Sequence, residues 1–497
     1  MIEWRMKLKG WRTALATLLL SSSLTYAQTW TPVTTPAPFS ANVALLLTDG
    51  TVMVQDAETP NWWRLTPDET GSYVNGTWTA LAAMASNYGP LYHASAVLPD
   101  GRVIIEGGEY NNGNEDWTNQ GAIYDPTTGT WTAIAPPAGW KYIGDAQSVV
   151  LANGTFMLAN SLTTQQALLD AKTLTWTPTG TGKFDINDEE GWTLLSNGSV
   201  LAVDAYVNRY SATGMNSEIY SPSTGAWSSA GSTMVQLWDS SANCGGASKA
   251  SFELGPAVLR PNSTVFATGA NRCRAGHTSI YHTATKTWTA GPDLPNGDDI
   301  ADGPAALLPN GNVLVDSSPG IYLTQRGTQF YEFNGTRFTP VPGPPNAPND
   351  SSFYGNMLVL PTGQILFTDF SSDVEIYTAK GTYKPAWAPT ITSAPASVIR
   401  GKTYKIMGTQ FNGLSQGAAY GDDEQSASNY PLVRITNNAT GHVFYCRTHN
   451  HSTMAVATKA KIVGTHFDVP ISIETGPSTL VVVANGIPSA AVAITVN

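Results

Sequence analysis

The residues with the clearest chemical potential are carboxylates that follow one another in the middle of the chain. The run Asp185–Trp192 contains Asp188, Glu189 and Glu190 in consecutive positions. Carboxylates this close raise one another's pKa unless a cation or a hydrogen-bond donor intervenes. Such a set can supply an acid beside a base, as in glycoside hydrolysis, or oxygen ligands for calcium. A solvated loop that caps strand ends is the alternative.

Other polar and aromatic residues share one local context with this run. Each comes shortly before an apolar strand that ends in a tight turn, usually Asp-Gly or Asn-Gly, the strongest local signal for a β-hairpin. The residues in this position are Asn42, Tyr92, His93, Asp145, Asp188, Glu189, Glu190, Glu253, Asp302 and Tyr354. Hairpins that surround one axis begin at the same face, so we expect these residues to converge on one acidic opening, called here the mouth.

The elements that must position these residues are repeated units of four strands. A strand with a central aromatic residue recurs, and in each unit a hairpin and a third strand accompany it. Its central residues are Trp30, Trp78, Trp131, Trp176, Trp227, Trp288 and Phe338. Units of roughly 45–60 residues are typical of propeller blades. The pattern predicts an all-β fold with a seven-bladed propeller over residues 28–385.

The order of the strands predicts how the ring closes. The strand around Trp30 comes before the first hairpin. The last hairpin, at Thr362-Gly363, is followed by Val374–Tyr377 but by no tryptophan strand. Residues 29–33 should therefore form the outermost strand of the last blade, which removes two sheet edges.

The composition fits this fold and argues against some functions. Of the 497 residues, 42% are hydrophobic and only 13% are charged, while glycine (46), proline (32) and tyrosine (20) are frequent. That balance favours short strands and tight turns over helices. The formal net charge is -11, so we do not expect nucleic acid as a partner.

The N-terminal residues predict export. Basic residues followed by a short apolar run in residues 1–27 are typical of a cleaved signal peptide, with an uncleaved anchor as the alternative. No later segment is apolar enough to span a membrane. We therefore expect a secreted, periplasmic or cell-surface protein.

The C-terminal part of the chain has a different pattern. After a proline-rich linker, residues 386–497 predict a small β-sandwich. Three cysteines occur; we expect a disulfide between Cys244 and Cys273, and a buried free thiol at Cys446.

The repeated units resemble Kelch repeats, although the paired glycine of that repeat is intact only at Gly107-Gly108. A propeller followed by an immunoglobulin-like (Ig-like) domain is similar to secreted galactose oxidase and glyoxal oxidase. The resemblance implies one copper ion held by two tyrosines and two histidines. It also implies that one of these tyrosines is cross-linked to a cysteine and carries a radical.

The residues match this copper site only in part. Tyr92 stands eight positions before the hairpin residue Asp100, where the resemblance places the radical tyrosine. No cysteine lies near Ala41, where the cross-linking partner is expected, and Phe353-Tyr354 replaces a Tyr-His pair. We therefore expect no Tyr-Cys radical cofactor, while a copper or a calcium ion stays open.

The C-terminal domain offers further metal ligands. His449 and His451 lie two positions apart in Thr448–Ser452, hence on one face of an extended chain. The resemblance implies a histidine ligand from such a loop, so we expect Thr448–Ser452 near the ring axis; polar loop histidines are the alternative. Gly417–Glu424, which contains Asp422 and Asp423, is either a turn or a weak cation site.

Aromatic and basic residues outside the repeat complete the expected site. Trp117 and Trp192 do not occupy the repeated tryptophan position, so we expect them to offer stacking faces for sugars, with core packing as the alternative. Arg272 is expected to pair with the acidic mouth.

Three functions are compatible with this set. The first is an exported carbohydrate-interacting propeller, in which Asp188, Glu189 and Glu190 supply acid and base while Tyr92 and His93 orient the substrate. The ligand, a glycan or another small molecule, is then bound by Asp145, Glu253, Asp302, Tyr354, Trp117, Trp192 and Arg272. The second function is a divergent copper oxidase that uses Tyr92, Tyr354 and a C-terminal histidine. The third is a surface adhesion module without a reaction.

Overall fold

The structure consists almost entirely of short strands. The computed structural model describes residues 28–205, 215–239, 251–271, 275–320 and 327–497. In this part of the chain the helical elements are the single 3-10 turns η1 (Pro295–Gly297), η2 (Ala347–Asn349), η3 (Ser352–Tyr354) and η4 (Pro385–Trp387). No helix among the described residues is long and apolar enough to cross a membrane. The expected all-β fold is confirmed.

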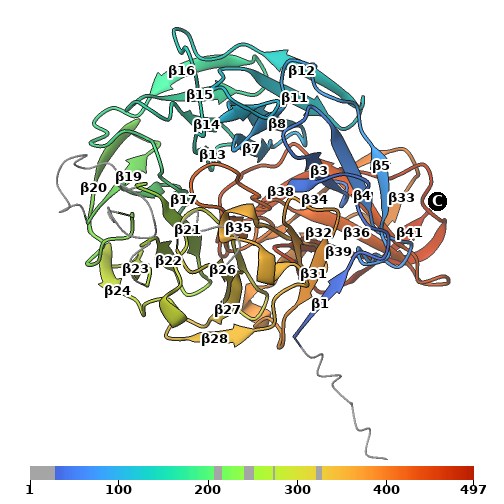
Figure 1. Cartoon of the computed structure of the whole chain (residues 1–497). Coiled ribbons are helices and arrows are strands. Elements are labelled where there is room, and N and C mark those ends of the chain that lie inside the picture. The colour runs from blue at the N-terminus through green and yellow to red at the C-terminus, as the bar shows by residue number, and fades with distance from the viewer. Residues whose placement is uncertain (1–27, 206–214, 240–250, 272–274, 321–326) are drawn as a thin grey trace, which may run out of the picture.

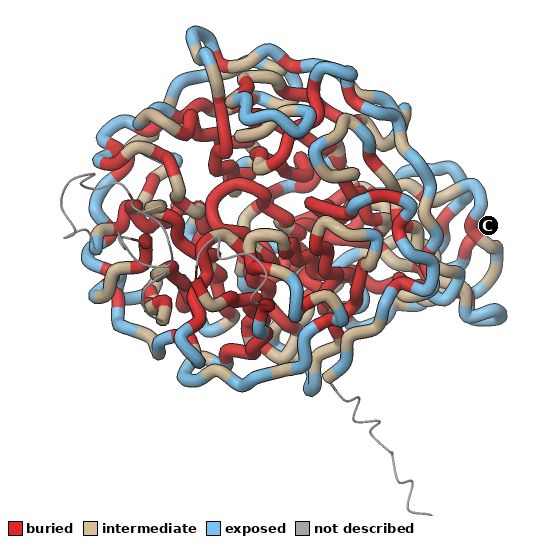
Figure 2. Tube along the Cα trace, in the orientation of Figure 1, coloured by how far each residue is buried: buried red, intermediate tan, exposed pale blue. Residues whose placement is uncertain are grey.

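Small antiparallel sheets surround a central axis (Figure 1). One sheet contains β7 (Ala94–Val97), β8 (Val103–Glu106), β11 (Gly121–Asp125) and β12 (Thr130–Ile134), from the axis outward. The inner strand β7 is buried along its whole length, whereas the outer strand β12 is mostly exposed. Figure 2 shows the same change across the ring, from buried inner strands to exposed outer strands. The apolar hairpins therefore build the core.

The same strand order, from inner to outer, recurs in the neighbouring sheets. These contain β2 (Ala41–Leu46), β3 (Val52–Asp56), β4 (Trp62–Thr66) and β5 (Thr77–Ala80); β13 (Ser148–Val150), β14 (Phe156–Ala159), β15 (Gln166–Asp170) and β16 (Thr175–Thr179); β17 (Trp192–Leu194), β18 (Val200–Val203), β19 (Asn216–Ser221) and β20 (Ala226–Ser232); β21 (Leu254–Leu259), β22 (Thr264–Gly269), β23 (Thr278–His282) and β24 (Thr287–Ala290); and β25 (Ala305–Leu307), β26 (Val313–Ser317), β27 (Gln329–Phe333) and β28 (Phe338–Val341).

The recurring tryptophan of the outer strand ties neighbouring sheets together. The Trp131 indole N–H donates to Ala82 O at 2.9 Å, and the Trp176 indole N–H donates to Ala135 O at 2.8 Å. In both cases the acceptor follows the outer strand of the preceding sheet. The repeat seen in the sequence is therefore the repeat of one contact between sheets.

The last sheet joins both ends of the ring. β29 (Asn356–Val359), β30 (Ile365–Thr368) and β31 (Glu375–Thr378) are completed by β1 (Thr29–Pro32), which places Trp30 opposite Tyr377. The centroid of the Trp30 ring lies 5.1 Å from that of Phe330 and 5.6 Å from that of Phe367. The predicted closure by residues 29–33 is confirmed, and the architecture is a β-propeller.

The chain after the ring forms a separate β-domain. Its strands are β32 (Thr390–Ser393), β33 (Ser397–Val398), β34 (Thr403–Thr409), β36 (Leu432–Asn437), β37 (Val443–His449), β38 (Val463–Asp468), β39 (Gly476–Ala484), β40 (Ile487–Pro488) and β41 (Val492–Val496). They enclose their own apolar core, in which Cys446 is a buried free thiol as expected. This domain lies on the hairpin-turn end of the ring, where Tyr445 contacts Gly50 and Trp387 contacts Gly311.

Thr448–Ser452, expected near the ring axis beside the acidic mouth, does not lie at the mouth. The Thr448 N–H donates to Thr48 O at 3.0 Å and the His451 N–H donates to Pro99 O at 3.2 Å. Both acceptors belong to hairpin turns, so this loop lies at the end of the ring opposite the mouth. The reason is that β37 continues to His449, which holds these residues in the sheet of the C-terminal domain.

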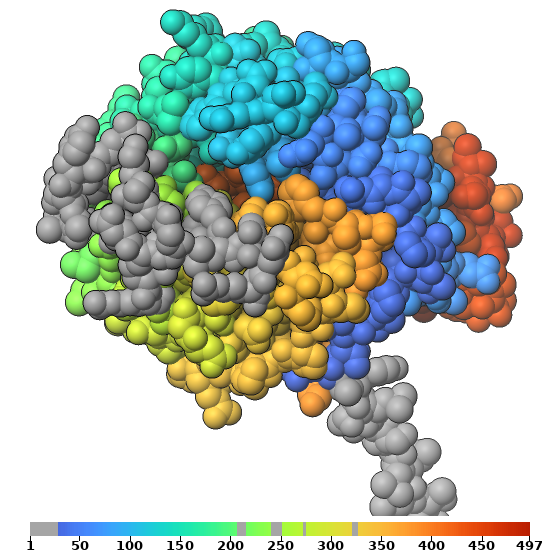
Figure 3. Space-filling model, viewed as in Figure 1, coloured from blue at the N-terminus to red at the C-terminus, as the bar shows by residue number. Residues whose placement is uncertain are grey.

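Residues 412–430, called here the insert, reach the axis instead. Within the insert, β35 (Ala418–Ala419) pairs with β25 as a fifth strand of that sheet. Ser95 Oγ donates to Gln425 O at 3.0 Å, and Ser426 Oγ donates to Asn356 Oδ1 at 3.0 Å. Figure 3 shows a hollow at the centre of the ring face, with orange-red atoms of the C-terminal part at its bottom. The insert therefore fills the channel and forms the floor of the mouth.

Candidate functional site

A cavity of about 710 Å³ opens at the mouth of the ring, and cavities of this size are typical of small-molecule sites. We call it the basin. Of the residues that we expected to converge, those that line the basin are Tyr92, Asp145, Glu189, Glu253, Asp302 and Tyr354. The structure thus brings these side chains together, while their roles in binding or catalysis stay predictions.

A constant spacing from the hairpin turn selects the residues that face the basin. Tyr92, Asp145, Glu189, Asp302 and Tyr354 each stand eight positions before the first turn residue of their hairpin. The inner strands β2 and β21 have a register shift near their first residues. There the lining residue stands nine positions before the turn, as Ser40 and Glu253 do. Each inner strand therefore delivers one side chain toward the axis.

The backbone at several of these positions is unusual. Tyr92, Glu189 and Asp302 have φ angles of 51°, 60° and 47°, in the left-handed region. Non-glycine residues in sparsely populated conformations cost of order 1–3 kcal/mol each and are common at functional sites. The basin therefore contains strained positions that the surrounding sheets hold in place.

The insert adds a second acidic set, which the sequence left open as a turn or a weak cation site. Asp422 and Asp423 line the basin. The adjacent Glu424 is held by two hydrogen bonds to its Oε1, from Asn42 Nδ2 at 3.1 Å and from the Tyr92 N–H at 3.2 Å. The propeller and the C-terminal part of the chain thus build the basin jointly.

Aromatic rings surround the carboxylates. The Tyr92 ring stacks on Tyr420 of the insert, with 24° between the planes and 6.4 Å between the centroids. The Tyr420 hydroxyl donates to Phe353 O at 2.7 Å, which fixes the insert to the rim. Besides Tyr92, the aromatic residues that line the basin are Tyr110, Phe353, Tyr354 and Phe370.

Ser161 joins two carboxylates at the edge of the basin. Its Oγ lies 2.8 Å from Asp145 Oδ1 and 2.8 Å from Asp188 Oδ1. A hydroxyl has one proton, so one of the two carboxyls must carry a proton for both contacts to be hydrogen bonds. Burial, followed by the charge of Asp188, raises the pKa of Asp145 well above its usual range. Asp188 is buried and is not part of the lining of the basin.

Other carboxyls of the basin titrate close to neutral pH. Burial raises the pKa of Asp302 to about 6 and, with the charge of Asp302, that of Glu109 to about 7. Burial, followed by the charge of Glu253, raises the pKa of Glu189 well above its usual range. Protonated and ionised carboxyls therefore coexist near neutral pH, which is the condition for general acid and base chemistry.

His93, expected to orient the substrate, does not face the basin. Its side chain is fully buried, its Nε2 lies 3.0 Å from Gln55 Oε1, and its ring packs near Trp62. Burial lowers the pKa of His93 to about 4, so the imidazole is neutral at physiological pH. His93 directly follows Tyr92, so the side chain one position after the basin residue enters the core instead.

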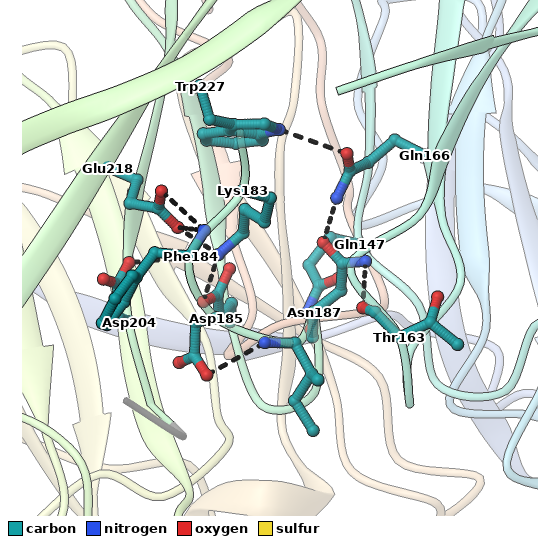
Figure 4. A network of polar contacts seen from close by, with 12 residues as sticks. Gln147, Thr163, Gln166, Lys183, Phe184, Asp185, Asn187, Asp204, Glu218 and Trp227 are labelled. Atoms are coloured by element: carbon teal, nitrogen blue, oxygen red, sulfur yellow. Dashed lines mark hydrogen bonds and ion pairs between the residues drawn. The ribbon is translucent and has the colours of Figure 1, made fainter. Parts of the chain in front are cut away.

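Glu190, expected to be an acid or a base, is likewise directed away from the basin. Its Oε1 accepts from Lys183 Nζ at 2.9 Å, and Lys183 also lies 2.6 Å from Glu218 Oε2. Figure 4 shows Lys183 of this cluster with Glu218 and Asp204. Burial opposes the charge of Lys183, but the three carboxylates together raise its pKa. The expected catalytic role is therefore corrected: Glu190 belongs to a buried ion-pair cluster.

The tryptophans that we expected to stack on sugars lie outside the lining of the basin. Trp192 belongs to the inner strand β17, is buried, and has its ring centroid 5.7 Å from that of Trp227. Trp117 contacts Gly144 and Tyr142. Core packing, the alternative, therefore holds for Trp192, whereas Trp117 is half-buried and is not part of the core cluster.

Two further expectations concern residues outside the described part of the chain. Arg272 lies there, and so do Cys244 and Cys273. The pairing of Arg272 with the mouth and the disulfide between the two cysteines therefore stay predictions.

The two C-terminal histidines have separate partners among the described residues. His449 Nε2 lies 3.1 Å from Asp468 Oδ1, and His451 Nδ1 lies 2.8 Å from Thr465 Oγ1. Asn450 between them has a φ of 51°, which breaks the alternation on which their shared face was predicted. No group of three potential metal ligands among the described residues includes His449 or His451, so the structure favours the alternative of polar loop histidines.

The residues of the basin do not fit the copper-radical centre of the oxidases. None of the described residues that line the basin is a histidine or a cysteine. Ala41, at the expected cysteine position, is a buried residue of β2, and Phe353-Tyr354 offers no imidazole. Carboxylate oxygens instead suit hard cations such as calcium and magnesium.

Comparison with known sequences gives one short match and no family. No family model matches the chain. A segment of 80 residues is 34% identical to the "Kelch-like protein terF" of Aspergillus terreus. This segment spans 16% of the chain and 17% of that relative, so it supports a Kelch-like repeat and nothing about the activity of the whole protein.

Comparison with solved structures agrees with the fold. A fungal alcohol oxidase of the AA5 family, solved in complex with copper, matches 95% of this chain and 99% of its own, with a TM-score of 0.52 and 13% identity. A streptogramin B lyase matches 71% of this chain and 97% of its own, with a TM-score of 0.47 and 11% identity. At such identities the likeness concerns the fold alone, which is that of a Kelch- and galactose-oxidase-like β-propeller.

Proposed function

We propose that this chain is an exported, seven-bladed Kelch-type propeller with an Ig-like C-terminal domain, and that it binds or processes a glycan in the basin. The observation that carries this proposal is the presence of aromatic rings and carboxylates in one cavity of about 710 Å³. The apolar face of a sugar packs on aromatic rings, and its hydroxyls donate to carboxylate oxygens. An acidic cavity also disfavours anionic ligands.

The proposed roles follow from the position of each group. Tyr92, Tyr110 and Tyr354 offer ring faces, and Asp145 and Glu189 accept hydrogen bonds from hydroxyls. In the processing form, Glu109, with a pKa of about 7, protonates the leaving oxygen, and an ionised neighbour activates water.

The number of blades and the export of the protein are proposed on separate grounds. Six four-stranded sheets and one five-stranded sheet among the described residues, closed by β1, support seven blades. The basic and apolar residues within 1–27 support export to the periplasm, the cell surface or the medium.

A glycan array combined with an assay for released reducing sugar tests the proposal. We expect the wild type to bind a defined set of glycans, and Asp145→Asn and Glu109→Gln to weaken binding by about tenfold or more, as loss of a buried anchor does. Glu115→Gln is the control, because Glu115 is an exposed residue of β10 (Asn114–Glu115) outside the lining. Absence of glycan binding, or equal binding by the basin variants, would overturn the proposal.

A divergent copper-dependent oxidase is the second proposal. It is favoured by Tyr92 and Tyr354 in the basin of a fold that resembles the fungal alcohol oxidase. Release of hydrogen peroxide from galactose or glyoxal by copper-loaded protein, abolished in Tyr92→Phe, would replace the first proposal by this one. Glycan binding without any product would support the binding form of the first proposal, which a surface adhesion module would also show.

A further inference from the structure

We propose that the basin holds a hard divalent cation of the calcium type, bound by Glu189, Asp302 and Asp422. One carboxylate oxygen from each residue lies within 4.8 Å of the other two. Calcium–oxygen distances of about 2.3–2.6 Å allow a single ion to contact three oxygens with this spacing. The ion joins two sheets of the ring to the insert.

Asp422 provides a second, independent indication of a ligand. Its side chain is 2% exposed and lines the basin, yet its Oδ2 has no hydrogen-bond partner among the described residues. A buried carboxylate oxygen without a donor costs free energy that a native structure normally recovers. A cation between the three carboxylates satisfies this oxygen and offsets their mutual repulsion.

Among the described residues that line the basin, no basic side chain could offset the charge of the carboxylates. No lysine, arginine or histidine is among its lining residues. Lys183 is already engaged by Glu190 and Glu218 in the buried cluster. A counter-charge for those carboxylates that are ionised has to come from outside this lining, and a bound cation supplies it.

The three ligands are held in place before any ion binds. Glu189 and Asp302 have fixed left-handed backbones at the starts of their inner strands. Gly421, directly before Asp422, passes so close to Asp302 that a Cβ on it would lie 2.3 Å from Asp302 Oδ1. This close approach brings Asp422 to the ring, so the site needs little rearrangement to bind an ion.

The ligand set selects the kind of cation. Oxygen ligands suit calcium, which takes 6–8 oxygens in flexible geometry, whereas copper favours imidazole and sulfur. Three protein oxygens leave positions open toward the basin for water or for neighbouring hydroxyls of a glycan. This last step rests on the proposed function, whereas binding of the cation does not.

Metal titration of the full chain tests the site. Protein stripped with EDTA is titrated with CaCl2, MgCl2, MnCl2 and CuCl2 by calorimetry, and melting temperatures are recorded with and without each ion. We expect one calcium ion per chain and a higher melting temperature with calcium. Asp422→Asn and Glu189→Gln should weaken calcium binding by more than about tenfold, and Glu115→Gln should not.

The melting temperature of each variant in EDTA shows whether it is folded. The two substitutions lie on different elements, so if one variant does not fold, the other still tests the site. A wild type that binds no divalent cation, or calcium binding that survives in both variants, would overturn the inference. Repeating the glycan assay in EDTA separates the two proposals. Glycan binding without any calcium response overturns the cation alone, and calcium binding without any glycan overturns the glycan function alone.

Discussion

A single buried lysine holds three carboxylates together beside the basin. Lys183 Nζ lies 2.9 Å from Glu190, 2.6 Å from Glu218 and 4.0 Å from Asp204, and its side chain has no exposed area. Burial, opposed in part by Lys183, raises the pKa of Asp204 to about 8. Asp204 is therefore mostly protonated at neutral pH, and the cluster carries less negative charge than its composition suggests.

Removal of this lysine should destabilise the fold. Lys183→Met leaves Glu190 and Glu218 buried without a counter-charge, and loss of one partner of a buried ion pair typically costs about 3–5 kcal/mol. Urea unfolding at pH 7 measures this loss, with Lys172→Met as the control because Lys172 is exposed. A loss below about 1 kcal/mol, the level of an ordinary surface substitution, would show that Lys183 does not neutralise the cluster.

Glu106 on β8 predicts a pH-dependent effect. Its side chain is fully buried, both carboxylate oxygens lack partners among the described residues, and burial raises its pKa well above the usual 4.5. Because the folded pKa exceeds the unfolded one, ionisation destabilises the fold as the pH rises above about 4.5. Glu106→Gln should therefore raise the melting temperature at pH 8 and leave it nearly unchanged at pH 4.

The matched control is Glu115→Gln, which removes an exposed carboxylate and should act equally at both pH values. If Glu106→Gln lowered the melting temperature at pH 8, the ionised carboxylate would have to have hydrogen-bond donors in the folded protein, contrary to the structure.

At the scale of elements, the insert is the segment on which the basin depends. Asn42 on β2 and Glu424 of the insert are hydrogen-bonded although 382 positions separate them in the chain. The floor of the basin exists only because residues 412–430 pass along the axis. The C-terminal domain therefore acts on the site from the opposite end of the ring.

Gly421→Ala tests this dependence. A Cβ at Gly421 would lie 2.3 Å from Asp302 Oδ1 and 3.1 Å from Leu254 O, so the insert must move away from the ring. We expect calcium and glycan affinity to fall by about tenfold or more, which is at least about 1.4 kcal/mol, as measured by calorimetry. Gly441→Ala is the control for backbone strain alone: its φ of 78° disfavours a side chain, but Gly441 does not line the basin, so the affinity should not change. Unchanged affinity in Gly421→Ala would contradict the role of the insert.

The strands were predictable because they repeat, and the site was predictable only where it follows the repeat. The offset of eight positions before the hairpin turn places Tyr92 and Glu189 in the basin and excludes His93 and Glu190, each one position later. The offset of eight positions can be counted in the sequence. The prediction from sequence took all residues just before a strand together, so it did not separate His93 and Glu190 from Tyr92 and Glu189.

Other features of the site leave no pattern in the local sequence. The insert is not part of any repeat, so no pattern indicates that it crosses the ring and carries Asp422 to the mouth. The left-handed Asn450 between His449 and His451 is likewise set by tertiary contacts. These features depend on residues far apart in the chain, which a single sequence does not reveal.

The whole molecule combines a closed ring with a domain that plugs it. β1 seals the ring from the N-terminal side, and the insert fills the channel from the C-terminal side. The basin is the resulting cavity, but it is not the only place with aromatic side chains. A groove of about 400 Å³ near β16 carries Trp140 and Trp176, and it offers a competing surface for a sugar.

A crystal structure of the full chain with calcium and the best-binding oligosaccharide of the array is the most direct measurement. We predict sugar density in the basin, with hydroxyls within hydrogen-bond distance of Asp145 or Glu189 and a ring face on Tyr92 or Tyr354. The contradictory result is a sugar bound in the groove of Trp140 and Trp176 while the basin holds only water. That outcome would show that the acidic mouth is not the ligand site.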